Sequence, residues 1–320
     1  MQEIYAVVSN EFQAVNDTII KQLHSGVGLV EDIGHYIVEA GGKRLRPLVV
    51  LLSAQACGYK GTQHVDLATI IEFIHTATLL HDDVVDVSDM RRGRFTANAK
   101  YGNAPSVLVG DFLYSRAFQM MVTLQNMRIM DILSSATNTI AEGEVLQLIN
   151  AGDPTVSEQQ YFDVIKYKTA TLFEAATHTG AILAEATPVH EEALRQYGLN
   201  LGIAFQLIDD VLDYQGDPQK LGKNVGDDLA EGKPTLPLIY AIKNSSAAQA
   251  EIIRQGILNK DLNRLKEILE IVQNSGAIAY TLEQARKISA QAISNLTHLQ
   301  ESAEKSALIR LANLAVDRSF

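Results

Sequence analysis

A long apolar stretch that ends abruptly in acidic residues constrains the fold of this chain more than any other feature. Residues 67–80 are mostly apolar and contain no Gly or Pro, which predicts a buried helix. His81 comes next, followed by the carboxylates Asp82, Asp83 and Asp86. Asp82 and Asp86 share one face of a helix, and like charges at this spacing destabilise it by roughly 0.2–0.5 kcal/mol per pair. A divalent metal would neutralise this repulsion.

The same pattern occurs a second time. An apolar helical run over residues 199–207 also ends in acidic side chains, Asp209, Asp210 and Asp213. One such cluster alone is equally compatible with a solvated helix end. Its recurrence at the end of a second buried helix favours a metal site, in which the two clusters face each other across one cavity.

Helical periodicity dominates the rest of the chain, and strand alternation is scarce. Apolar residues recur every three or four positions from Ile4 to Leu23, which predicts one amphipathic helix. The pattern also predicts a helix over 160–185, a helix stop at Gly41-Gly42 with Pro47 in the first turn of the next helix, and helix breaks near Asn259 and Asn274. The 320 residues are 47% hydrophobic and contain no evident linker. We therefore expect an all-α fold with a single domain over residues 1–320, in which polar loops (91–105 and 214–232) follow the two acid clusters.

Charge and cysteine content exclude several classes of protein. The net charge is −11 and there is no basic tract, which argues against a nucleic-acid partner. The single Cys57 rules out an intrachain disulfide and fits a reducing compartment. The first residues do not resemble a secretory signal, and no apolar run reaches the length of a membrane span. A cytoplasmic location without a transmembrane segment is expected.

Basic residues gather near the acid clusters although the chain as a whole is acidic. Taken singly, each could be an ordinary surface cation. Together they suit the oxygens of a diphosphate, and Gly41 and Gly42 allow the backbone to approach a ligand closely. Mg²⁺ is usually held by protein carboxylates together with substrate phosphates. Two groups of cations suggest two anionic substrates, and the residues are Lys43, Arg44, Arg46, Arg91, Arg92, Lys168, Lys223 and Lys233.

These motifs, in this order, resemble the trans-polyprenyl diphosphate synthases. The resemblance runs from the GGKRLRP segment at 41–47, through both acid clusters and Lys168-Thr169, to Lys233-Pro234-Thr235. The segments at 107–112, 141–148 and 222–228 are most similar to those of the bacterial octaprenyl-forming members. The resemblance implies a bundle of roughly ten or more helices around a deep cavity, and a homodimer.

The resemblance also assigns roles to individual residues. It implies that Asp82, Asp83 and Asp86 hold two Mg²⁺ ions on the allylic diphosphate, and that Asp209, Asp210 and Asp213 hold a third. It implies that isopentenyl diphosphate is bound by Lys43, Arg46, His75 and Arg92, and the allylic substrate by Arg91, Lys168, Thr169, Gln206 and Lys223. Without the resemblance, His75 would more often be a core histidine. Gln206 lies one helical turn before Asp210, so the two side chains share a face.

The implied reaction is ionisation, condensation and elimination. Mg²⁺ and the cations stabilise the departing diphosphate, which can itself accept the proton that is lost at the end. The implied product is a long all-trans chain, octaprenyl diphosphate for a quinone side chain, with solanesyl or heptaprenyl diphosphate as alternatives. A terpene cyclase would share the ionisation step but would need no second anion site. A non-catalytic subunit should have lost acids, whereas both clusters are complete here.

Product length should depend on residues one helical turn before the first acid cluster. Ala77 and Thr78 occupy that layer, where the short-chain relatives carry bulky aromatic residues. The small Ala77 leaves the layer open and favours a product longer than farnesyl. Phe118, Met120 and Met121 could form the floor of the cavity, although Met is equally suited to fill an ordinary core.

Overall fold

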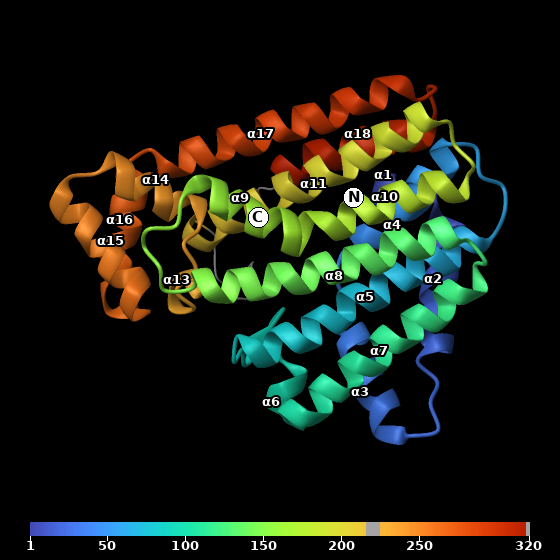
Figure 1. Cartoon of the computed structure of the whole chain (residues 1–320), viewed down its shortest axis with the longest axis horizontal. Helices are drawn as coiled ribbons and strands as arrows, with labels where there is room; N and C mark the ends of the chain where they lie inside the picture. Colours follow the sequence, from blue (N-terminus) through green and yellow to red (C-terminus); the bar gives the residue numbers. More distant parts are fainter. Residues whose placement is uncertain (216–224, 318–320) are drawn as a thin grey trace. The chain divides into compact units, whose positions relative to one another are not determined.

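The computed structural model describes residues 1–215 and 225–317, which are almost entirely helical (Figure 1). The expected all-α fold is confirmed. In the described part of the chain the strands are β1 (Met90–Arg91) and β2 (Arg94–Phe95), which pair antiparallel. Contacts divide the chain into two units, and each is described by itself. Unit 1 holds residues 1–137, 172–198 and 295–311, and unit 2 holds 138–171, 199–294 and the chain from 312 onward. The prediction of a single domain stays a prediction.

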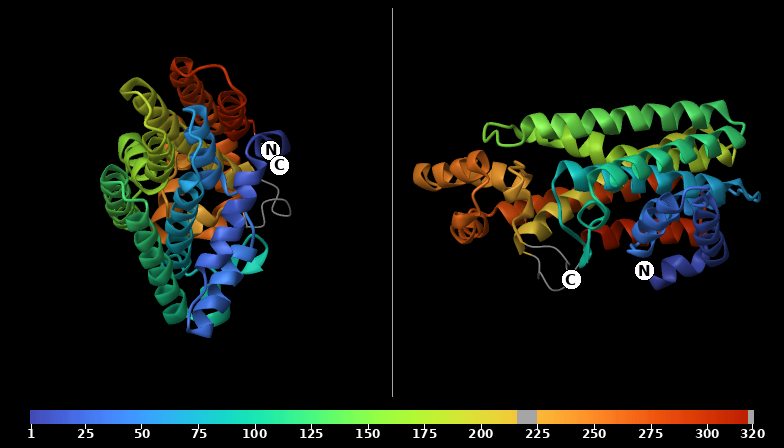
Figure 2. Two further views of the ribbon diagram at one scale, coloured as in Figure 1. Left: turned by 90° about the vertical axis from the view of Figure 1, so that its right-hand side faces the viewer. Right: turned by 90° about the horizontal axis from the view of Figure 1, so that it is seen from below.

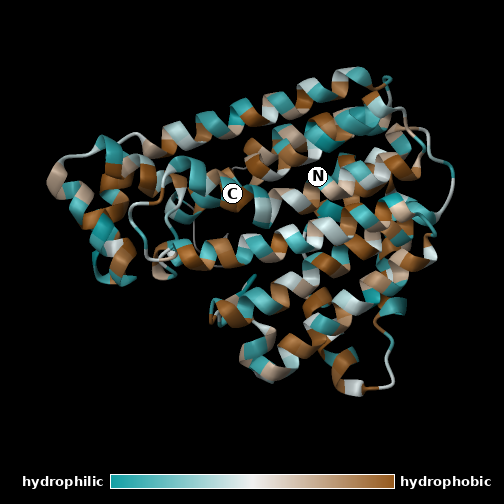
Figure 3. Ribbon diagram, viewed as in Figure 1, coloured by the Kyte–Doolittle hydropathy of each residue, from teal (hydrophilic) through white to brown (hydrophobic). Residues whose placement is uncertain are grey.

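Unit 1 is built around α5 (Gln63–Val85), the long helix that carries the first acid cluster. Helices α2 (Ser9–Gln22), α4 (Leu45–Ala56) and α7 (Asn103–Thr123) pack against it, and α5 and α7 run side by side in every view (Figures 1 and 2). Apolar residues recur along these helices (Figure 3), and nearly every apolar side chain of α5 between 67 and 80 is fully buried. The buried helix predicted from the apolar run is therefore present.

The amino-terminal segment forms two helices where one was expected. α1 (Gln2–Val7) and α2 are separated at Val8, whose backbone leaves the helical region at φ −127° and ψ 33°. Ile4, Val8, Val15 and Ile19 are all buried, so the expected apolar stripe is right and the continuous helix is wrong. Val8 keeps its place on the apolar stripe, and periodicity therefore gave no indication of the break.

The segment expected to be a loop at 91–105 is more ordered than its polarity suggested. Besides the β1–β2 hairpin it contains α6 (Ala97–Tyr101), and α7 already starts at Asn103. Thr96 caps α6, because its side-chain oxygen accepts a hydrogen bond from the Ala99 amide at 3.3 Å. The expectation of an irregular loop there is wrong, and the N-cap threonine was the signal that would have corrected it.

Unit 1 is completed by α3 (Gly28–Glu39) and by parts of helices that continue into unit 2. These shared helices are α8 (Met127–Asn150), α11 (Pro188–Gln215) and α18 (Ala303–Val316), and α10 (Thr171–Leu183) lies in unit 1 from Leu172 onward. As expected, α3 is followed by a glycine turn, with Gly41 at φ 75° and Gly42 at φ 142°, and Pro47 lies in the first turn of α4.

Unit 2 contains the second acid cluster and two apolar clusters of its own. Its helix breaks after Asn259 and Asn274 lie where the sequence predicted them, with Lys260 and Gly276 in the left-handed region. A five-residue π-helix, Lys166–Ala170, interrupts the helix expected at 160–185. The helices of this unit are α9 (Glu158–Ile165), α13 (Asp227–Ala230), α14 (Leu236–Asn244), α15 (Ala247–Asn259), α16 (Leu265–Asn274) and α17 (Ala277–Asn295), with short 3₁₀ turns at Leu262–Arg264 and, in unit 1, Leu296–His298.

Candidate active site

The first acid cluster occupies the last turn of α5, where the helix leaves the core. Asp83 is only 1% exposed, whereas Asp82 and Asp86 are half-buried. Arg91 from β1 donates to Asp83 Oδ1 through Nε at 2.9 Å and through Nη2 at 2.7 Å. Burial lowers the pKa of Arg91, but these hydrogen bonds and the nearby aspartates outweigh it, and the net shift is upward. Arg91 therefore stays charged and neutralises one of the three carboxylates.

One carboxylate oxygen of Asp83 takes no part in the hydrogen bonds from Arg91. Its Oδ2 is buried and has no hydrogen-bond partner among the residues that the structure describes. A buried carboxylate oxygen without a donor is energetically costly unless a cation or a water molecule satisfies it. The donor set therefore fits a hard, oxygen-seeking cation. Within residues 1–215 and 225–317, however, no three acid, His or Cys side chains converge as a complete metal ligand set.

The second acid cluster lies on the carboxyl-terminal part of α11 and is more deeply buried. Asp210 is 3% exposed and Asp213 is fully buried, whereas Asp209 is half-buried. Asp213 Oδ2 accepts a hydrogen bond from the Asp228 backbone amide at 3.3 Å. Of the three, Asp209 is thus the carboxylate that is most open to solvent.

Asp210 takes part in a hydrogen-bond chain that links three elements of unit 2. Tyr161 of α9 donates to Asp210 Oδ2 at 2.5 Å, and Gln206 Nε2 donates to Oδ1 at 2.8 Å. Thr169 of the π-helix donates to Gln206 Oε1 at 3.0 Å. Burial, then the charge of Asp228, raise the pKa of Asp210 to about 8, against the two hydrogen bonds that lower it. Without a bound cation, Asp210 holds a proton at neutral pH.

The π-helix presents Lys168 and Thr169 in succession. Lys168 Nζ donates to Glu144 of α8 at 2.6 Å. A side chain on Gly143 would lie 2.7 Å from the Lys168 backbone nitrogen, so only glycine allows α8 to approach the π-helix this closely. The sequence reasoning singled out Lys168 and Thr169 but missed Tyr161 and Glu144. For Tyr161, the available signal was its position seven residues before Lys168, about two helical turns, which places both residues on one face of a helix.

The expected isopentenyl diphosphate ligands in unit 1 form a second, strongly basic cluster. Arg46 Nη1 lies 3.2 Å from His75 Nε2, and its guanidinium carbon lies 4.4 Å from the centre of the Phe173 ring. Burial, and then the charges of Arg46, Arg92 and Arg91, hold the pKa of His75 well below its ordinary value. His75 is therefore neutral at pH 7 and accepts the hydrogen bond from Arg46.

Other members of the basic cluster are positioned by backbone and acid contacts. Arg92 lies against Gly42, where a side chain would come 2.5 Å from its Nη1 atom. Lys43 is exposed, and its backbone oxygen accepts a hydrogen bond from Tyr5 at 2.5 Å. Glu72, which the sequence reasoning missed, lies one turn before His75, and burial raises its pKa against the charges of neighbouring arginines. The spacing of three on α5 could have identified it. Lys223 lies outside the described residues.

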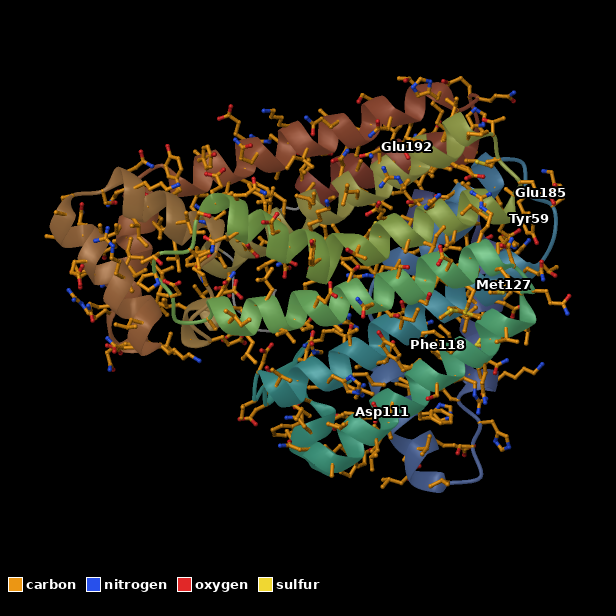
Figure 4. All side chains as sticks on the ribbon, in the orientation of Figure 1. Tyr59, Asp111, Phe118, Met127, Glu185 and Glu192 are labelled. Atoms are coloured by element: carbon orange, nitrogen blue, oxygen red, sulfur yellow. The ribbon has the colours of Figure 1, made fainter. Side chains whose placement is uncertain are left out.

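The residues expected to set product length lie on α5 and α7 of unit 1. Ala77 is fully buried, and Thr78 donates to the His75 carbonyl at 2.8 Å. Met120 and Met121 are buried, and Phe118, on the same helix as Asp111 (Figure 4), is half-buried. Phe118 and Met121 share a face of α7, whereas Met120 points to another face because it is two positions from Phe118. Their role as a cavity floor stays a prediction, as does the convergence of the two acid clusters.

Comparison with known proteins gives consistent results over the whole chain. Residues 27–274 match the family model described as polyprenyl synthetase. The octaprenyl diphosphate synthase of Escherichia coli is 51% identical over 319 residues, covering 99% of each chain. The all-trans-nonaprenyl-diphosphate synthase (geranyl-diphosphate specific) of Rhodobacter capsulatus is 48% identical over 318 residues, covering 99% of this chain and 98% of the relative.

A solved structure gives the same result for the fold. The polyprenyl synthase of Caulobacter crescentus, crystallised with calcium and isoprenyl diphosphate, superposes with a TM-score of 0.96 at 43% identity. The match covers 99% of this chain and 97% of that one.

Among the described residues, none of the helices combines the length and the apolar character that a membrane crossing requires.

Proposed function

The chain belongs to the polyprenyl synthetase family, and on that premise we propose that it is an octaprenyl diphosphate synthase. The predicted family and the predicted prenyltransferase activity are confirmed. The octaprenyl product rests on one observation, the 51% identity to the Escherichia coli octaprenyl enzyme over almost the full length of both chains. A product one unit longer is the alternative, because the Rhodobacter capsulatus nonaprenyl enzyme is nearly as similar.

The two basic groups receive the two substrates. Lys43, Arg46, His75 and Arg92 bind isopentenyl diphosphate, and Arg91, Lys168, Thr169, Gln206 and Lys223 bind the allylic diphosphate, for which farnesyl diphosphate is the expected primer. The neutral His75 supports this assignment, since it orients Arg46 without adding positive charge of its own. The hydrogen-bond chain from Thr169 through Gln206 to Asp210 supports the assignment of these two residues to the second group.

Two to three Mg²⁺ ions are the proposed cofactors, held by Asp82, Asp83, Asp86, Asp209, Asp210 and Asp213. The all-oxygen donor set and the unsatisfied Asp83 Oδ2 support a hard cation. Bound Mg²⁺ would neutralise the charge of the allylic diphosphate. The proton that Asp210 holds without metal would have to leave before Asp210 could act as a ligand.

The residues of the chain then promote the reaction by position and charge. Arg91 and Lys168 stabilise the negative charge that grows on the departing diphosphate. The double bond of isopentenyl diphosphate, held by Arg46 and its neighbours, attacks the allylic cation, and the released diphosphate accepts the proton that is lost. Apolar side chains along α5 exclude water from the cation, and the growing tail passes the small Ala77.

The remaining proposals concern the setting of the enzyme. Val107 and Leu108, exposed on α7 at 37% and 66%, support a homodimer in which this helix face is covered. We place the enzyme in the cytoplasm and propose that its product supplies the side chain of a quinone.

The test is to give purified protein farnesyl diphosphate, labelled isopentenyl diphosphate and Mg²⁺, and to size the extracted product. We expect an eight-unit chain and no turnover without isopentenyl diphosphate. Asp86→Asn should abolish the activity, whereas Asp89→Asn, which changes an exposed acid three residues further along, should retain it. Turnover of farnesyl diphosphate alone to a hydrocarbon would indicate a cyclase, and a seven- or nine-unit chain would refute the octaprenyl assignment.

A further inference from the structure

The carboxyl end of α5 contains a residue that folding alone does not explain. The Ser88 amide donates to the Asp83 carbonyl at 3.0 Å and the Val87 amide donates to the Val84 carbonyl at 3.3 Å, the two bonds of a Schellman motif. The position between them requires a left-handed backbone and is usually glycine. Here it is Val87, with φ 52° and a side chain that is 79% exposed. A β-branched residue in this conformation is strained, and a side chain this exposed is covered too little for packing to offset the strain.

Other exposed apolar side chains surround this position. Val85 is 62% exposed, Met90 is 47% exposed and Phe95 is 64% exposed. Met90 and Phe95 are direct partners in the β1–β2 ladder, so their side chains lie on the same face of the hairpin. Four large apolar side chains are thus exposed within eleven consecutive residues. Such a cluster indicates a surface that is covered in use.

The hairpin and α6 are positively charged in an acidic protein. Residues 90–101 contain four cations and no acid, whereas the chain as a whole has a net charge of −11; Asp86 and Asp89 precede this segment, beside Val85, Val87 and Met90. Arg91 is bonded to Asp83, but Arg94 and Lys100 are exposed. The hairpin is held to α3 by the Tyr36 hydroxyl, which donates to the Phe95 carbonyl at 2.7 Å.

The cations are accompanied by tyrosine rings. Lys100 Nζ lies 4.0 Å from the centre of the Tyr36 ring and 4.9 Å from that of Tyr101, and the two rings meet edge to face. Tyrosine rings and basic side chains next to protruding apolar residues are the composition of surfaces that bind at the boundary between lipid headgroups and acyl chains.

We propose that this surface, which we call the hairpin tip (Val85, Val87, Met90, Arg94, Phe95 and Lys100), docks the enzyme on an anionic lipid bilayer. The apolar side chains enter the headgroup region while Arg94 and Lys100 contact lipid phosphates. A second copy of the chain is a poorer occupant, because a two-fold contact would place these cations against their own equivalents. The benefit of docking rests on the proposed function, because a long polyprenyl product is insoluble in water and is released into a membrane. Docking itself does not require turnover and can be measured without substrate.

A single reporter residue tests the contact. The chain contains no tryptophan, so Phe95→Trp gives the only indole fluorescence in the protein. We expect its emission to shift to shorter wavelength with vesicles of phosphatidylcholine and phosphatidylglycerol, and much less with phosphatidylcholine alone. Met127→Trp is the matched control, because Met127 at the start of α8 is 76% exposed but has no comparable basic segment (Figure 4). No shift for Phe95→Trp, or an equal shift for Met127→Trp, would overturn the proposal.

Charge and apolar variants supply the second arm of the test. Arg94→Glu combined with Lys100→Glu should weaken vesicle partitioning by roughly tenfold or more, since each basic residue near an anionic surface contributes about fivefold. Val87→Asp should also weaken it, whereas Arg254→Glu, an exposed arginine of unit 2, should not. Docking is refuted if the hairpin-tip variants partition onto vesicles as wild type does. It is also refuted if these variants lose a dimer on size-exclusion chromatography instead of losing vesicle binding. Prenyl transfer without vesicles is measured separately, so that failure of the proposed function is distinguished from failure of docking.

Discussion

Replacing Asp210 with asparagine should stabilise the metal-free protein, although it removes a proposed metal ligand. Burial and the charge of Asp228 raise the pKa of this carboxyl to about 8, so the folded chain keeps a proton that an unfolded aspartate releases above about pH 4. The contribution of the Asp210 proton to the free energy of unfolding is fully present below about pH 4 and is lost as the pH rises toward 8. Above about pH 8 it changes no further. Asparagine has no proton to lose and avoids this penalty.

The size of the effect follows from one proton. Linkage limits the slope to about 1.4 kcal/mol per pH unit, so wild type should lose at most about 4 kcal/mol more than Asp210→Asn between pH 5 and pH 8. Relaxation around the site should reduce this to about 1–3 kcal/mol, or roughly 2–6 °C in Tm. Tyr161 can still donate to the asparagine carbonyl, and the Gln206 amide can turn over to accept from its NH₂ group.

The assay is thermal unfolding in EDTA across this pH range, with Asp89→Asn as a control that changes an exposed acid. The Tm of Asp210→Asn should fall less steeply with pH than the Tm of wild type and of the control. Mg²⁺ with inorganic diphosphate should stabilise wild type more than the variant, since binding raises stability only where a site exists. Parallel Tm curves for the variant and wild type would refute the protonated state of Asp210.

Three further substitutions test other parts of the site. Ala77→Tyr should fill the layer below the first acid cluster and shorten the product to about the farnesyl class, and unchanged long chains on thin-layer analysis would contradict this. Arg91→Met leaves the buried Asp83 carboxylate without its donors and should cost about 2–4 kcal/mol in denaturant unfolding, reduced because Arg91 is partly exposed; equal stability would show that the pair contributes nothing. Gly143→Val should push α8 from the Lys168 backbone and reduce turnover at least tenfold, which a wild-type kcat would disprove.

The sequence was most informative where an apolar period continued without interruption. The long α5 and the helix boundaries at Asn259 and Asn274 followed from periodicity, glycine and capping. The break at Val8 did not, because Val8 continues the apolar period of Ile4, Val15 and Ile19 and the period gives no sign of the change in backbone. Helix α6 was missed although Thr96 offered a visible cap.

The site was predictable in its residue types but not in its contacts. The recurrence of the acid pattern identified Asp83 and Asp210, yet nothing local shows that Arg91 bonds the first or that Tyr161 bonds the second. Tyr161 and Asp210 are separated by 49 residues in the chain, and only the packing of α9 on α11 brings them together. Burial is likewise a property of the fold, so the raised pKa of Asp210 could not be anticipated from the sequence.

The π-helix at Lys166–Ala170 has a consequence for how this enzyme can vary. A π-turn contains one residue more than the α-helical register, so its geometry depends on the number of residues and not only on their identity. Deleting one residue there would remove the extra residue that the wide turn accommodates, and the segment could return to a regular α-helix with its flanking turns in register. Thr169 lies inside the turn, so its hydrogen bond to Gln206 is a contact that such a deletion would displace. The number of residues in this turn is therefore constrained as well as the identity of Lys168 and Thr169, because a change in length would separate both side chains from Glu144 and Gln206.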